Sequence, residues 1–335
     1  MRPLKTLSLA IFLSLCGCQI SPRVGQPNPQ ATGQLYVLTS NAILRFSHAT
    51  AATGNIAPDA SISGSSVGLS SPEGIFLDTT NDRLFVANKG ASSILVFDQV
   101  STLSGNIAPS RTISGNATHL SAPLSLVLDN NNNLYVADGT HVLVFGSASN
   151  VNGNVAPSRN FDMTTTLGQI FLDATNDQLY LAEPTVDTVE RVDNASIQNG
   201  IGVASVAIVG ADTGLATPTG ITLDANFRLF VSNNSAPVSI VNYANAAGAT
   251  NNPDVAPSGK ISGAQTALIA PGQLFLNRNA TNGELYVADQ GAGAILVFTN
   301  VANQNGAPAP ARSISGGSTQ ISVNSVNGVA LDLTR

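Results

Sequence analysis

The chain of 335 residues has no tryptophan, only two cysteines, and charged side chains that make up just 10% of its composition. The low content of Lys, Glu and Arg argues against a helical protein, and the 43% hydrophobic content argues against a disordered one. Acidic residues outnumber basic ones by 20 to 14, so the sequence offers no basic stripe for a nucleic acid. We therefore expect no DNA or RNA partner.

Both cysteines lie within the first eighteen residues. They can provide neither a disulfide nor a zinc site for the rest of the chain. They follow a basic start and an apolar run at residues 6–15, which is too short to span about 30 Å of hydrocarbon as a helix. This pattern is typical of a secretory signal peptide, which we assign to residues 1–18.

The signal peptide ends in Leu15-Cys16-Gly17-Cys18, which resembles a bacterial lipobox with Cys18 as the lipidated residue. The resemblance implies a lipid anchor in the cell envelope. Because Gln19 rather than aspartate follows the cysteine, it points to the outer membrane, on its periplasmic or surface side. Ordinary secretion with two incidental thiols is the alternative. Residues 19–32 contain three prolines and no apolar periodicity, which indicates a tether.

The rest of the sequence repeats about every fifty residues. Its clearest unit begins with the first phrase, residues 72–78 (PEGIFLD), and continues with the second phrase, residues 83–88 (RLFVAN). Two further apolar phrases, residues 93–98 and 111–115, complete the unit. Each phrase is rich in Val, Ile, Leu and Phe and is bounded by Gly, Asn, Asp or Pro, as expected for strands. Four short strands per repeat are typical of a propeller blade.

The two ends of the chain supply one broken repeat. The repeats begin with a second phrase at residues 34–39 and end with a first phrase that closes at Asp332. Each end has the piece that the other lacks. We therefore predict an all-β protein, a six-bladed β-propeller formed by residues 33–335 as one domain, with the ring closed by the C-terminal strand joining the N-terminal blade.

The recurring Pro-x-Gly-Ile-x-Leu-Asp and Leu-Tyr-Val-Ala-Asp phrases resemble those of six-bladed propellers built from NHL-type repeats. They resemble YncE-like and gluconolactonase propellers more distantly. This likeness covers residues 33–335 and concerns architecture, because propellers of one fold serve as enzymes, ligand binders and scaffolds.

A candidate site follows from the topology. If the first phrase is the innermost strand and the second returns antiparallel, the start of the first and the end of the second share one face around the channel. The residues at the start of the first phrases are Glu73, Leu124, Gly168, Thr219, Gly272 and Asn327. Those that end the second phrases are Thr39, Asn88, Asp138, Glu183, Asn233 and Asp289. Carboxylate and amide oxygens suit a hard cation such as calcium.

Gluconolactonase propellers hold a catalytic cation with Glu, Asn and Asp side chains, and the resemblance implies such a role for Glu73 and Asn327. Asn88 and Asp289 complete the candidate metal set, although the Asp expected from that family is absent. Asp138, Glu183, Asn233 and Thr219 are further candidates on the channel face. The alternative is structural: residues repeated in every blade cap the turn into the third strand.

We identify no catalytic residue and expect a membrane-anchored binding or scaffolding module for a protein or carbohydrate ligand. Two alternatives remain open. One is a metal-dependent, lactonase-like hydrolase, and the other is a structural protein of the envelope.

Overall fold

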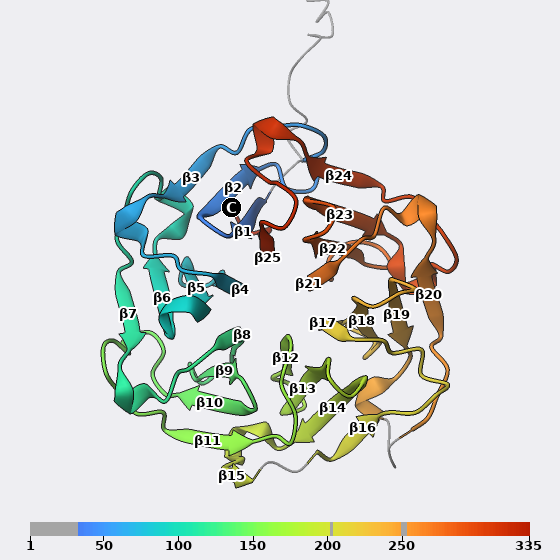
Figure 1. Ribbon diagram of the computed structural model, residues 1–335, viewed down its shortest axis with the longest axis horizontal. Coiled ribbons are helices and arrows are strands. Elements are labelled where there is room, and N and C mark those ends of the chain that lie inside the picture. Colours follow the sequence, from blue (N-terminus) through green and yellow to red (C-terminus); the bar gives the residue numbers. More distant parts are fainter. Residues whose placement is uncertain (1–32, 202–203, 249–252) are drawn as a thin grey trace, which may run out of the picture.

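The computed structural model describes residues 33–201, 204–248 and 253–335. Their strands form six antiparallel blades in a ring around a central channel (Figure 1), which confirms the predicted six-bladed propeller. The predicted signal peptide, lipidated Cys18 and tether lie outside the described residues and stay predictions. Among the described residues, no helix has the length and apolar character needed to cross a membrane.

Each blade is named here by its place in the chain, and its strands run from the channel outward. Blade 1 has β25 (Val326–Asp332), β1 (Gln34–Thr39), β2 (Ala42–Ser47) and β3 (Ala60–Ser63). Blade 2 has β4 (Pro72–Asp78), β5 (Arg83–Asn88), β6 (Ser93–Asp98) and β7 (Arg111–Ser114). Blade 3 has β8 (Pro123–Leu128), β9 (Leu134–Asp138), β10 (His141–Phe145) and β11 (Arg159–Asp162).

The second half of the ring follows the same order. Blade 4 has β12 (Ile170–Asp173), β13 (Gln178–Glu183), β14 (Thr188–Asp193) and β16 (Val206–Ile208). Blade 5 has β17 (Pro218–Leu223), β18 (Leu229–Asn233), β19 (Ser239–Tyr243) and β20 (Gly259–Ser262). Blade 6 has β21 (Pro271–Asn277), β22 (Glu284–Asp289), β23 (Ala294–Thr299) and β24 (Arg312–Ser315). The short β15 (Gly200–Ile201) pairs in parallel with β11 of blade 3.

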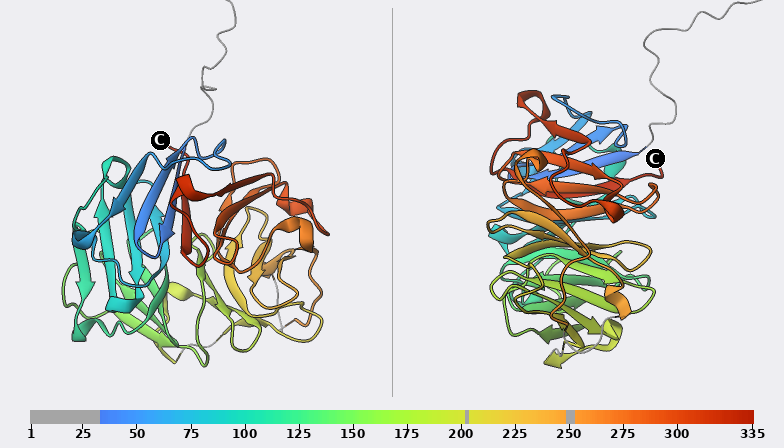
Figure 2. Two further views of the ribbon diagram at one scale, coloured as in Figure 1. Left: turned by 45° about the horizontal axis from the view of Figure 1, so that its top comes forward. Right: turned by 90° about the vertical axis from the view of Figure 1, so that its right-hand side faces the viewer.

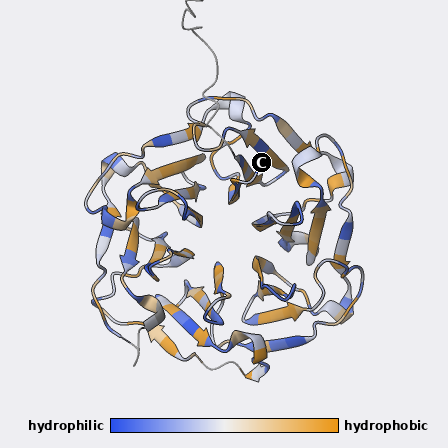
Figure 3. Ribbon diagram, turned by 180° about the vertical axis from the view of Figure 1, so that it is seen from behind, coloured by the Kyte–Doolittle hydropathy of each residue, from blue (hydrophilic) through white to orange (hydrophobic). Residues whose placement is uncertain are grey.

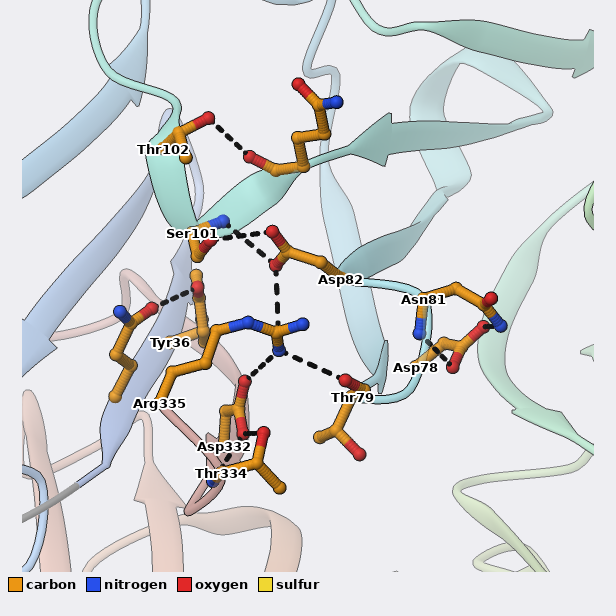
Figure 4. A network of polar contacts seen from close by, with 12 residues as sticks. Tyr36, Asp78, Thr79, Asn81, Asp82, Ser101, Thr102, Asp332, Thr334 and Arg335 are labelled. Carbon is orange, nitrogen blue, oxygen red and sulfur yellow. Dashed lines mark hydrogen bonds and ion pairs between the residues drawn. The ribbon is translucent and has the colours of Figure 1, made fainter.

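The two ends of the described chain close the ring, as predicted. β25 is the innermost strand of blade 1 and pairs antiparallel with β1 from Gln34↔Asp332 onward. The last residue then links blade 1 to blade 2, because the Arg335 guanidinium donates to the Thr79 carbonyl at 3.0 Å and pairs with Asp332 at 2.5 Å (Figure 4). The pairing of β1 with β25 thus closes the ring within residues 34–332, and Arg335 adds a link to blade 2.

Strand direction gives the disc two different faces. Pro72 pairs with Asn88 at one face, which we call the mouth face, and Asp78 pairs with Arg83 at the other, the back face. Since β1 starts where β25 ends, the first described residue lies on the back face beside the last, and the Gly33 amide donates to the Arg335 carbonyl at 3.0 Å (Figure 2).

Apolar clusters between neighbouring blades form the core, visible as the orange strand segments of Figure 3. With no tryptophan available, the largest fully buried side chains are four tyrosines at equivalent positions of the second strands: Tyr36, Tyr135, Tyr180 and Tyr286. Burying such large rings between the blades stabilises their packing.

The recurring Gly-Asn segments before the outer strands cover the edge of the preceding blade. Gly105 of blade 2 bridges in parallel to Ile62 of blade 1, and Gly54, Gly153 and Gly306 do the same for blades 6, 2 and 5. The following asparagine adds a side-chain contact: Asn106 accepts from the Ser66 amide at 2.8 Å. These contacts satisfy strand edges that would otherwise be free to pair with other chains.

One arginine in each of five blades adds a second tie to the next blade. The arginine lies on the third or on the outer strand, at one fixed pair of positions that face each other. The pair is Val144↔Arg159 in blade 3 and Arg191↔Val206 in blade 4. Each guanidinium donates to a carbonyl after the third strand of the next blade: Arg45 to Ser101, Arg111 to Ala148, Arg159 to Gln198, Arg191 to Ala246 and Arg312 to Ala49. In blade 5 the facing pair is Asn242↔Gly259, so the junction with blade 6 lacks this tie.

We predict that Arg159→Ala lowers the free energy of unfolding by about 1–3 kcal/mol, because the carbonyls of Ala195 and Gln198 lose their donor. Arg159 also stacks on Tyr135, with 5.5 Å from the guanidinium carbon to the ring centroid. Urea unfolding measures the loss. The control is Lys260→Ala on β20, and an equal effect of both substitutions would contradict the arginine tie.

Candidate functional site

The mouth face opens into a cavity of about 310 Å³ at the head of the channel. All six residues predicted from the start of the first phrases line it, namely Glu73, Leu124, Gly168, Thr219, Gly272 and Asn327. The remaining polar lining side chains are Ser125, Thr166, Gln169, Asn234, Gln273 and Gln290. The mouth cavity thus receives side chains from every blade.

The polar side chains of the mouth are only partly engaged with one another. Glu73 pairs with Lys89 at 3.1 Å, and both side chains are more than a third exposed, so water weakens their attraction. Asn327 donates to the Pro72 carbonyl at 2.6 Å and accepts from Gln290 at 3.1 Å. These contacts leave hydroxyl and amide groups at the rim that can exchange hydrogen bonds with a ligand.

The residues predicted from the ends of the second phrases lie elsewhere. Asn88, Asp138, Asn233 and Asp289 have 0% exposure and bind the loop that enters the innermost strand of their own blade. Asn88 accepts from the Ser70 amide at 2.7 Å, and Asp289 accepts from the Ile269 and Ala270 amides at 2.9 Å.

Two of these side chains, Asn88 and Asn233, also reach the third strand, as the structural alternative expected. Asn88 donates to the Ser93 hydroxyl at 3.1 Å, and Asn233 donates to that of Ser239 at the same distance. Thr39 takes a related position, where its hydroxyl contacts the Ala42 backbone. Their oxygens and amides are therefore already used within the fold.

Of the candidate metal set, the structure brings Glu73 and Asn327 to one cavity, whereas Asn88 and Asp289 do not line it. Among the described residues, no group of three or more His, Cys, Asp and Glu side chains is arranged to hold a metal ion. The cation site stays a prediction.

In three blades the mouth is lined instead by the residue after the second strand. Pro184, Asn234 and Gln290 line the cavity, and they follow Glu183, Asn233 and Asp289 directly. Successive residues of a strand point to opposite sides, so a shift of one position turns a buried side chain into an accessible one. Asn234 is exposed and makes no side-chain hydrogen bond with the described residues.

Two glutamines that the sequence analysis passed over form a septum below the mouth. Gln169 of blade 4 accepts from the Ile221 amide of blade 5 at 2.9 Å and exchanges hydrogen bonds with the backbone of Leu274 in blade 6. Gln273 of blade 6 accepts from the Val329 amide at 3.1 Å and donates to the Ile75 carbonyl at 2.9 Å. Each side chain crosses one blade and reaches the next.

A departure from the repeat marks these glutamines. The third position of the first phrase is Gly or Ser in four blades and Gln at Gln169 and Gln273. Gly328 lies beneath Gln273, and a Cβ there would come within 2.5 Å of the Gln273 Oε1 atom. The long amide therefore needs glycine in the neighbouring blade.

Below this septum is a second cavity of about 270 Å³, the chamber, whose lining shares only Gln169 and Gln273 with the mouth. Its walls are Ile, Leu, Val and Phe side chains of the innermost strands, and Arg278 lines it from the turn after β21. The channel is thus divided into a polar and an apolar space.

Glu183, a predicted channel-face residue, is buried with 1% exposure. Its carboxyl group contacts that of Glu190, which pairs with Leu181 on the neighbouring strand. The Glu183 Oε1 atom has no hydrogen-bond partner among the described residues. Burial and the Glu183 carboxylate together raise the pKa of Glu190 to about 7, and burial also raises the pKa of Glu183. Two acids in this position share a proton near neutral pH.

No family model and no curated protein matches the chain, so the NHL-type resemblance stays a prediction. Several solved structures are similar to it. A protein of unknown function from Bacteroides caccae has a TM-score of 0.59 and 10% identity, covering 90% of this chain and 98% of that one. The nidogen/laminin complex contains a chain with a TM-score of 0.61 and 13% identity, covering 90% and 99%.

A third similar structure is a Bacteroides fragilis protein provisionally described as a 6-phosphogluconolactonase. Its TM-score is 0.59 and its identity 13%, over 92% of this chain and all of that one. At such identities the likeness shows the fold alone. The protein is therefore a six-bladed β-propeller, and its function has to be argued from its own residues.

We predict that the stability of the wild-type protein falls between pH 5 and pH 8 through the Glu183–Glu190 pair. The unfolded chain releases this proton near the ordinary value of 4.5, whereas the folded chain keeps it until about pH 7. Raising the pH through this interval thus lowers the free energy of unfolding. Glu190→Gln should reduce the difference between the free energies of unfolding that urea unfolding gives at pH 5 and at pH 8. The matched control is Glu73→Gln, and a wild-type difference in Glu190→Gln would contradict the shared proton.

Proposed function

We propose that the protein is a tethered binding module that presents its mouth cavity to a neutral, hydroxyl-rich ligand such as a carbohydrate. The observation that carries the proposal is the separation of the two faces. The mouth lies on one face, and Gly33, from which the predicted tether departs, lies on the other.

The lining of the mouth favours this ligand class. Its accessible polar groups are mainly the Thr166 hydroxyl and the amides of Asn234 and Gln290, which both donate and accept hydrogen bonds. Its volume is at the lower end of the 300–1,000 Å³ range of small-molecule sites. A terminal sugar unit matches this chemistry better than a charged ligand, because the acid Glu73 already has Lys89 as its partner. A protein ligand remains the other class that could use the same face.

The proposed anchor agrees with this arrangement. Lipidated Cys18 would hold the back face toward the outer membrane, and a tether of about 14 residues at about 3.3–3.6 Å each reaches roughly 50 Å. The mouth would then face away from the membrane and toward soluble ligands. The cavity also favours a binding role over that of a purely structural envelope protein.

We predict that the chain without residues 1–18 binds carbohydrate in isothermal titration against glucose, N-acetylglucosamine and maltose. Asn234→Ala should weaken the binding by about 2- to 10-fold, the equivalent of one hydrogen bond. The matched control is Asn279→Ala on the back face, which should leave affinity unchanged. Absence of binding to all three sugars, or equal losses in the two variants, would count against the carbohydrate proposal.

A metal-dependent lactonase is the second candidate, favoured by Glu73 and Asn327 lining one cavity. If it is right, calcium-dependent hydrolysis of gluconolactone should fall at least about 100-fold in Glu73→Gln, because a metal ligand supplies several kcal/mol of transition-state stabilisation. Glu190→Gln, at a carboxyl outside the mouth, should retain the rate. A rate that is independent of calcium and of Glu73 rejects this candidate.

A further inference from the structure

The chamber below the septum has an almost entirely apolar wall. Phe76, Phe171 and Phe275 occupy the same position of the innermost strands in blades 2, 4 and 6. Val127, Thr222 and Ala330 occupy it in blades 3, 5 and 1. Large and small side chains thus alternate around the ring, and Thr222 supplies the single hydroxyl of the lining.

The roof of the chamber offers few free polar atoms. The oxygens of Gln169 and Gln273 already accept backbone amides, and their nitrogens already donate to the Leu274 and Ile75 carbonyls. An apolar cavity of about 150 Å³ suffices to bind benzene. At about 270 Å³ the chamber accommodates a longer apolar group.

Arg278 provides a cation where the chamber meets the back face. Its guanidinium carbon lies 5.2 Å from the centroid of the Phe171 ring, and its Nε atom donates to the Leu223 carbonyl at 2.8 Å. These two contacts fix the direction of the guanidinium against the chamber wall. Its two Nη atoms make no hydrogen bond to the described residues and can serve an anion.

Two nearby carboxylates, Asp173 and Asp224, leave the guanidinium accessible because they hold their own turns. Asp173 accepts from the Asn176 side chain at 2.7 Å, and Asp224 accepts from the Arg228 amide at 2.8 Å. Burial lowers the pKa of Arg278, and these carboxylates partly offset the effect, so the side chain remains charged at neutral pH.

We propose that the chamber binds an anionic amphiphile, with the apolar chain inside the chamber and the carboxylate or phosphate paired with Arg278 at the back face. The site is independent of the mouth, because the septum separates the two cavities. A short fatty acid is the simplest ligand of this class, and the acyl chain of an anionic membrane lipid carries the same chemistry.

Octanoate tests the proposal in isothermal titration with the chain lacking residues 1–18. We expect saturable binding that Arg278→Gln weakens at least about 10-fold, since the charge-assisted pair is lost. Ala330→Phe should abolish it by filling the chamber. Octanol, which has the same chain without the charge, should bind more weakly and be insensitive to Arg278→Gln. Far-UV circular dichroism verifies that each variant is folded.

Two control variants separate this site from its surroundings. Arg228→Gln removes a cation from the same face outside the chamber and should leave octanoate binding unchanged. Asn234→Ala in the mouth should do the same, so that failure of the carbohydrate proposal and failure of this one are distinguishable. Competition by phosphatidylglycerol vesicles, but not phosphatidylcholine vesicles, identifies membrane lipid as the source, and absence of competition identifies the free acid.

The proposal is overturned if millimolar octanoate gives no saturable binding. It is equally overturned if octanoate binds Arg278→Gln, or folded Ala330→Phe, as tightly as it binds the wild-type protein.

Discussion

The ring depends on one contact that recurs at the blade boundaries: a glycine of one blade pairs with the outer strand of the blade before it. An isolated four-stranded blade has an unpaired outer edge and two apolar faces. Exposing them to water is unfavourable, so such a blade is not stable alone. The Gly-Asn segments cover the edge, the aromatic clusters cover the faces, and the arginine ties join the two. Since these contacts join one blade to the next around the ring, the arrangement is complete only when the last blade meets the first, which is the role of β25.

Closing the ring through blade 1 also determines on which face the two described ends lie. Both described ends lie on the back face, so anything attached there leaves the mouth face unobstructed. The septum then divides the channel into two spaces of opposite character. One propeller can thereby offer a polar site on one side and an apolar site on the other, through residues at opposite ends of the same innermost strands.

The repeat was sufficient to predict the fold, because phrases such as residues 72–78 report strand direction and order as well as strand identity. Glu73 and Asn327 of the candidate set line the mouth. Asn88 and Asp289 do not, because strand alternation turns these side chains into the blade. Gln169 and Arg278 were missed for another reason. Comparing the repeats identifies residues that the blades share, whereas these two side chains occur at positions where their blades differ from the others.

Among the described blades, the junction between blades 5 and 6 is the one at which the facing pair Asn242↔Gly259 replaces the arginine. The Gln169–Leu274 hydrogen bonds extend from blade 4 to blade 6, across blade 5 and this same junction. The Gln169 side chain therefore adds a link at the junction that has no arginine tie, so the partition between the two cavities also helps to hold the ring together.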